Sequence, residues 1–155
     1  MKLREFIIPE AIIANLKASD RDGAIRELVS SLAERGALPT TAVDEVVTAL
    51  VKREQNGSTG FGKGVAVPHV KHPKVKQMAG TIGRSEAGID FAALDHQPVY
   101  SIVLLLSPEN QPKQHLDAMN IVFSNLQKDM FRKFLRQSAT REAIVDLLDE
   151  ADQGK

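Results

Sequence analysis

The sequence lacks cysteine, an excess of charge of either sign and any long apolar run. Without cysteine there are no disulfide bonds, no thiolate metal ligands and no cysteine nucleophile. The 20 Lys and Arg residues equal the 20 Asp and Glu residues in number, so the overall charge does not favour nucleic acid as a partner. No apolar segment approaches the roughly 20 residues of a membrane span, and the first residues lack the pattern of a signal peptide. We therefore expect a cytoplasmic protein without direct membrane insertion.

The composition that remains is typical of a soluble globular protein. Of the 155 residues, 43% are hydrophobic and 26% are charged. A chain of this size buries roughly 68–70% of the surface that its unfolded form exposes, which is enough for a hydrophobic core. We find no internal repeat and no low-complexity segment. The sequence thus predicts one domain over residues 1–155.

Apolar residues at helical spacing mark two helices in the first third of the chain. The first is expected from its cap at Asp22 to about residue 35, where Gly36 can end it in a left-handed conformation. The second follows a proline, has Thr41 and Asp44 in the arrangement of a capping box, and ends near Arg53. Both helices carry an apolar face that must be buried against another element.

Strands and further helices alternate over the rest of the chain. Short strands are expected at 65–67 and 78–84, and the β-branched apolar run 99–106 is typical of a buried central strand. Helices are expected at 113–127, at 129–137 and after a cap at Thr140, before a frayed acidic tail from residue 149. This order predicts an α/β fold, with one mixed sheet and helices on both faces. Side chains expected to face inward from the first two of these helices are Leu116, Met119, Val122, Phe123, Leu126, Met130, Phe131, Phe134 and Leu135.

A glycine-rich loop at 56–64 leads into the first strand, which Pro68 ends directly before His69. Proline has no backbone N–H and cannot continue a strand ladder, so the next residue is presented at a sheet edge or rim. Glycines let backbone N–H groups approach an anion closely. The loop has neither the G-x-G-x-x-G pattern of dinucleotide sites nor the Lys-Ser/Thr ending of a P-loop.

The residues around this loop suit phosphoryl transfer. Neutral imidazole is a nucleophile near pH 7, and attack on a phosphoryl donor would give a phosphohistidine at His69. Arg53 could offer a forked cationic donor, while Ser58, Thr59 and the backbone at Gly60 could bind phosphate oxygens. No metal and no other cofactor is required. The alternative is a purely structural histidine at the end of a strand.

Residues 53–69 read Arg-Glu-Gln-Asn-Gly-Ser-Thr-Gly-Phe-Gly-Lys-Gly-Val-Ala-Val-Pro-His. This string closely resembles the phosphorylation-site motif of the IIA components of the bacterial phosphotransferase system, in the fructose/mannitol and nitrogen-regulatory branch. The resemblance continues through the apolar run 99–106, Ser107-Pro108 and His115-Leu116. It covers most of the chain after residue 40.

The resemblance implies specific roles for three residues. His69 would carry the phosphoryl group on its Nε2 atom, His115 would be the second histidine of the site, and Arg53 would face the phosphate. It also implies a layered IIA-type fold, an HPr-like phosphorylated carrier as the donor, and a IIB domain or a regulatory target as the recipient. The chain would thus be a phosphotransferase component, or would act purely as a regulator.

Three functions remain open at this point. One is a regulatory switch of the nitrogen-regulatory type, which a chain with no attached IIB or membrane domain favours. Another is the IIA subunit of a sugar transporter that feeds a IIB domain. A histidine metal-binding module is the third, since His69 and His72 form a His-x-x-His pair and His96 and His115 bring the histidines to four. The basic stretch 71–76 is either a solvated loop or a means of steering an acidic or phosphorylated partner.

Overall fold

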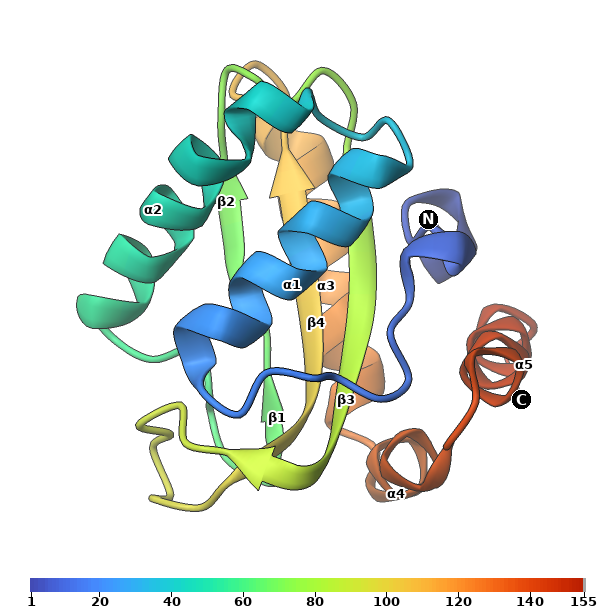
Figure 1. Ribbon diagram of the computed structural model, residues 1–155. Coiled ribbons are helices and arrows are strands. Elements are labelled where there is room, and N and C mark those ends of the chain that lie inside the picture. Colours follow the sequence, from blue (N-terminus) through green and yellow to red (C-terminus); the bar gives the residue numbers. More distant parts are fainter. Residues whose placement is uncertain (155) are drawn as a thin grey trace.

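The computed structural model describes residues 1–154, which form one sheet with helices packed on it (Figure 1). None of the helices within those residues is long and apolar enough to cross a membrane. The α-helices are α1 (Arg21–Glu34), α2 (Val43–Gln55), α3 (Pro112–Leu126), α4 (Asp129–Gln137) and α5 (Arg141–Asp152). The strands are β1 (Val65–Ala66), β2 (His69–Lys71), β3 (Ala79–Ile89) and β4 (Val99–Ser107), and short 3₁₀ turns occupy η1 (Leu3–Glu5), η2 (Pro9–Ala11) and η3 (Thr40–Ala42).

Strand β4 is the centre of the sheet, because every other strand pairs with it. Strands β1 and β2 are parallel to β4 in one continuous register, with Val65 opposite Ser101 and His69 opposite Leu105. They are therefore two halves of one interrupted strand. Strand β3 pairs with β4 antiparallel, with Ile82 opposite Val103. The mixed sheet expected from the sequence is confirmed.

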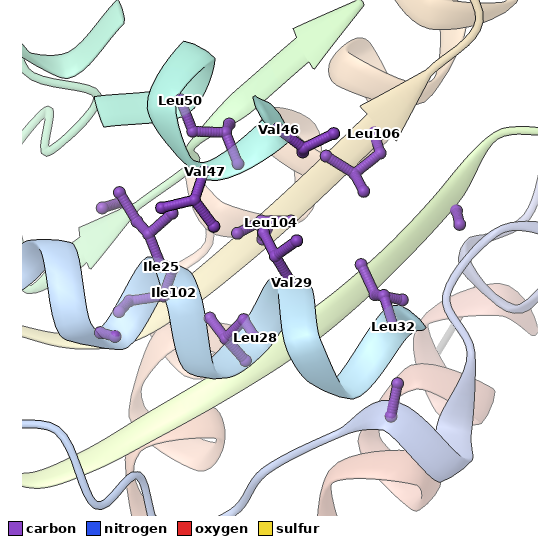
Figure 2. Packing of buried hydrophobic residues seen from close by; sticks show 14 of the residues in the cluster. Ile25, Leu28, Val29, Leu32, Val46, Val47, Leu50, Ile102, Leu104 and Leu106 are labelled. Atoms are coloured by element: carbon purple, nitrogen blue, oxygen red, sulfur yellow. The ribbon is translucent and has the colours of Figure 1, made fainter. Parts of the chain in front are cut away.

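Helices cover both faces of this sheet, as expected. Helices α1 and α2 lie on one face, and α3 lies behind the sheet in Figure 1. Side chains alternate along a strand. Accordingly Leu104 packs in the cluster of α1 and α2, whereas Leu105 packs in the cluster of α3, α4 and α5. Figure 2 shows the first cluster, in which Leu28 and Val46 contribute from the two helices and β4 supplies its even-numbered side chains.

The helix boundaries follow from local chemistry, with two corrections to the sequence analysis. The cap of α1 is Asp20, not Asp22, because the Asp20 carboxylate accepts from the Gly23 backbone N–H at 2.6 Å. The capping box expected at Thr41 does not form, because a 3₁₀ turn leads directly into α2 and no side chain caps it. The left-handed ending is confirmed, with Gly36 at a φ of +80°.

Part of the apolar pattern of α3 and α4 faces solvent instead of the core. Leu116, Met130 and Phe134 are 58%, 55% and 47% exposed, so the prediction that they face inward is wrong. A helix buries one stripe of its surface, and in α4 that stripe runs through Phe131 and Leu135. The spacing of apolar residues fits both the pair Met130 and Phe134 and the pair Phe131 and Leu135. Only the packing of α4 on the sheet decides which pair is buried.

The expected frayed tail is wrong up to residue 152, because α5 continues through it. The Asp152 carboxylate accepts from the backbone N–H groups of Leu3 and Arg4 at 2.7 and 3.0 Å, and Arg4 pairs with Asp149 at 2.5 Å. These bonds satisfy donors that the 3₁₀ turn η1 leaves unpaired. The two ends of the chain are thereby held together, while Lys155 lies outside the described residues.

Candidate active site

His69 is the first residue of β2, and the structure fixes one of its ring nitrogens. In the alternation of the interrupted strand it lies on the same side as Val65 and Val67, which pack toward α3. Its Nδ1 lies 2.7 Å from the carbonyl oxygen of Val67, two residues earlier. Because a carbonyl can only accept, Nδ1 carries the proton and donates it. The Nε2 atom therefore keeps its lone pair.

His115 lies in the first turns of α3, after Pro112 at the helix start. Its ring centroid is 5.6 Å from that of His69, with the two planes inclined by 42°. The Ser107 hydroxyl at the end of β4 lies 2.6 Å from Nδ1 of His115. The structure thus brings together the two histidines that lie 46 residues apart in the sequence.

Sequence reasoning assigned no role to Ser107, although it is fully buried beside the site. Ser107 ends β4 on the face toward α3, and a short loop then leads to the helix that carries His115. The sequence does contain one indication of this role. Ser107 is a polar residue at the carboxyl end of a buried strand, a few residues before the start of a helix. Such a position commonly contributes to a site in α/β folds.

Burial and charge both disfavour protonation of the two histidines. Burial lowers the pKa of His69, the Val67 carbonyl partly offsets this, and the charge of Arg53 lowers the pKa further. Burial also lowers the pKa of His115. The positive charges of a protonated His69 and of Lys71 lower the pKa of His115 further. Both rings are therefore neutral at pH 7, which is the form in which an imidazole nitrogen can attack.

The glycine-rich loop is held to α2 by a buried carboxylate. Glu54, which is 3% exposed, accepts from the Thr59 backbone N–H at 2.9 Å and from the Thr59 hydroxyl. The Ser58 hydroxyl donates to the carbonyl of Phe91 at 2.6 Å and accepts from the Gly60 backbone N–H at 2.9 Å. These three residues are thus bonded within the protein in this structure. Their contribution to phosphate binding stays a prediction.

Arg53 lies in the last turn of α2, at the start of the same loop. Its Nη1 donates to the carbonyl of Gly57 at 2.7 Å, and the side chain is exposed. The guanidinium is near enough for its charge to lower the pKa of His69. Arg53 thus lies within electrostatic reach of His69, and its contact with a phosphate stays a prediction.

The other two histidines lie apart from this pair. His72 turns toward α2, where its Nε2 is 3.4 Å from the Glu45 carboxylate, and its Nδ1 accepts from the backbone of Lys74. His96 is exposed in the β3–β4 connection at a φ of +58°. Within residues 1–154 no three His, Asp or Glu side chains are grouped as metal ligands would be. The metal-binding alternative therefore gains no support from the structure.

Comparison with known sequences identifies relatives in both branches. The chain matches the family described as "Phosphoenolpyruvate-dependent sugar phosphotransferase system, EIIA 2" over residues 5–151. It is 37% identical to a nitrogen regulatory protein of Bradyrhizobium diazoefficiens over 148 residues, which cover 96% of this chain and 95% of that protein. It is 30% identical to the fructose-specific EIIABC component of Bacillus subtilis over 99% of its own length, but spans only 24% of that larger protein.

Solved structures agree with the sequence relatives. The nitrogen regulatory protein IIA-Ntr of Neisseria meningitidis superposes with a TM-score of 0.83 at 29% identity, covering 93% of this chain and 97% of that one. The IIA mannitol structure from Escherichia coli shares the fold, with a TM-score of 0.75 at 20% identity over 90% and 96% of the two chains. The chain therefore belongs to the EIIA type 2 family of the phosphoenolpyruvate-dependent sugar phosphotransferase system.

Proposed function

We propose that the chain carries a phosphoryl group on Nε2 of His69. The Nε2 lone pair forms a bond to phosphorus while the P–N bond to the donor's own histidine breaks, and the donor nitrogen keeps that electron pair. In onward transfer the recipient's nucleophile attacks phosphorus and the electron pair returns to Nε2. The ring gains positive charge when it is phosphorylated, and the Nδ1–H bond to the Val67 carbonyl stabilises that charge.

His115 and Arg53 are the proposed partners of the phosphoryl group. When the Ser107 hydroxyl donates to Nδ1 of His115, the proton of that ring lies on Nε2, which can donate to a phosphoryl oxygen. Arg53, whose charge lowers the pKa of His69, offers a forked cationic donor for the phosphoryl oxygens. The equatorial oxygens carry most of the charge during transfer, so donors fixed in advance lower the barrier. We also propose that the loop segment formed by Ser58, Thr59 and Gly60 faces the phosphate.

The proposed donor is an HPr-like phosphorylated carrier, and the proposed output is regulatory. The match to a nitrogen regulatory protein covers nearly the whole of both chains at 37% identity. The transport alternative, delivery to a IIB domain, rests on the match to one part of a fructose-specific component at 30% identity. Either exchange would take place in the cytoplasm.

The family match runs over residues 5–151, and we propose that all of 1–155 forms one domain.

The hydrogen bond from Nδ1 of His69 to Val67 carries this proposal, because it selects Nε2 as the free nitrogen. To test it, the protein is incubated with a phosphorylated HPr-like carrier, and its mass is measured under basic and acidic conditions. Wild type should gain one phosphoryl group that survives base and is lost in acid. His69→Ala should gain none, whereas His72→Ala, with its ring directed toward α2, should gain it as wild type does. Equal phosphate uptake by His69→Ala would overturn the proposal.

A further inference from the structure

A groove with an excess of positive charge lies away from the histidine pair. It is bounded by α4, by β3 and by the turn of the glycine-rich loop, and has a volume of about 770 Å³. In Figure 1, α4 lies at the lower right, whereas β2, which begins with His69, lies at the left of the sheet. The charged residues that line it are Lys63, Arg84, Glu86, Asp129, Arg132, Lys133 and Arg136.

Arg84 is the feature that distinguishes this groove from a solvated basic surface. It is only 4% exposed, and its Nε is buried without a hydrogen-bond partner among residues 1–154. Its two terminal nitrogens both donate to a single oxygen of Glu86, at 2.8 and 2.7 Å. The Glu86 side chain is 81% exposed and lies two residues along the same strand. A buried guanidinium is thus balanced by one exposed carboxylate, which a stronger anion can replace.

Three further cations face the groove without a carboxylate of their own. Among residues 1–154 no Asp or Glu forms an ion pair with Lys63, Lys133 or Arg136, whereas Arg132 pairs with Asp129. Arg136 is held in place because its guanidinium carbon lies 3.5 Å from the centre of the Tyr100 ring. Five cations and two carboxylates therefore line the groove, which leaves three positive charges unbalanced.

We propose that this groove binds a small molecule that carries at least two phosphate groups. Its volume falls in the range of small-molecule sites, about 300–1,000 Å³. The unpaired cations come from separate elements, a loop and α4, with the buried Arg84 on β3, so one phosphate cannot engage all of them as well as two can. Lys63 also belongs to the loop that leads to His69, and its backbone N–H donates to Asp95 at 3.0 Å. A ligand in the groove would therefore contact the segment that leads through β1 to His69.

Pyrophosphate is the probe, titrated into the full-length protein by calorimetry at low ionic strength. We expect saturable binding at one site, and binding of inorganic phosphate that is at least tenfold weaker. Lys133→Gln and Arg136→Gln should each weaken pyrophosphate binding about tenfold, because each removes a charge-assisted contact. Glu86→Gln should tighten binding several-fold, since it removes the carboxylate that occupies Arg84. Arg84 itself is left intact because its replacement in the core could unfold the protein.

Two controls change the net charge equally at exposed places outside the groove. Lys17→Gln matches the loss of one positive charge, and Glu10→Gln matches the loss of one negative charge. Both should bind pyrophosphate within about twofold of wild type if the site is specific. The proposal is overturned if pyrophosphate does not saturate, if Lys17→Gln weakens binding as much as Lys133→Gln, or if phosphate binds as tightly as pyrophosphate. None of these outcomes depends on whether His69 is phosphorylated.

Discussion

The Ser107 hydroxyl and the His115 ring form a 2.6 Å hydrogen bond that fixes His115 at Nδ1. The Val67 carbonyl fixes the neighbouring His69 ring at its own Nδ1, at 2.7 Å. Both rings are thus held by the same nitrogen, one by a side chain and the other by the backbone. This common arrangement leaves the two Nε2 atoms available on rings whose centroids are 5.6 Å apart.

Ser107→Ala should therefore slow phosphoryl transfer more than it destabilises the fold. Loss of one buried hydrogen bond costs about 1 kcal/mol, but a freely turning His115 ring would no longer present a donor at a fixed place. We expect a five- to tenfold slower onward transfer from the phosphorylated protein, measured by rapid quench. Ser138→Ala is the matched control, because the Ser138 hydroxyl donates to the Phe134 carbonyl at 2.6 Å on another helix. Equal slowing by both variants would mean that Ser107 acts only through stability.

Thr59→Val should destabilise the protein while it preserves the shape of the side chain. The Thr59 hydroxyl donates to the buried Glu54 carboxylate, which would lose one of its partners. Leaving a buried charge under-bonded costs about 1 to 3 kcal/mol, measured by urea unfolding. Thr48→Val, at an exposed position of α2, should change stability by no more than about 0.5 kcal/mol. Similar stability of the two variants would remove Glu54 as the anchor of the loop.

Arg53→Lys and Arg53→Gln separate the charge of this residue from its geometry. The charge of Arg53 lowers the pKa of His69, so Arg53→Gln should raise that pKa and Arg53→Lys should leave it nearly unchanged in an NMR titration. If the fork grips phosphate, both variants should be phosphorylated at least several-fold more slowly, because lysine acts as a point charge. Unchanged phosphorylation of Arg53→Lys would assign Arg53 to the Gly57 contact and the helix end alone.

The lowered pKa values of both histidines predict how stability depends on pH. Unfolded histidines take up a proton near pH 6.5, whereas folded His69 and His115 resist protonation. The unfolded state then binds more protons, so the free energy of unfolding falls as pH decreases through and below 6.5. The double variant His69→Gln, His115→Gln should show a flatter dependence between pH 7 and 5 by urea unfolding. An unchanged slope would show that neither ring has a lowered pKa.

Sequence patterns predicted the features of this protein that depend on local chemistry. The proline after β1, the glycine-rich loop and the apolar run of β4 were sufficient to place His69 at the sheet. The helix capped by Thr140 also forms where expected, because its hydroxyl accepts from the Ala143 backbone N–H at 3.1 Å. Each of these features depends mainly on residues that are close together in the sequence, so it can be predicted from a single sequence.

What the sequence could not predict depends on residues far apart in the chain. The bond from the Ser58 hydroxyl to the carbonyl of Phe91, 33 residues later, could not be foreseen from the sequence, while its role in phosphate binding stays a prediction. Met130 and Phe134 have the spacing of core residues, yet only the docking of α4 decides that they face solvent. Asp152 was expected in a frayed tail, but it binds the backbone at Leu3. In each case the decisive partner is brought in by the tertiary fold.

The nitrogen that carries the phosphoryl group is the most direct test of the proposed mechanism. The protein, labelled with ¹⁵N in its histidines, is phosphorylated by an HPr-like carrier and observed by ¹⁵N and ³¹P NMR. We expect one phosphorus resonance with one-bond coupling to Nε2 of His69, while Nδ1 retains its proton against the Val67 carbonyl. Coupling to Nδ1 of His69, or to a nitrogen of His72, His96 or His115, would contradict it.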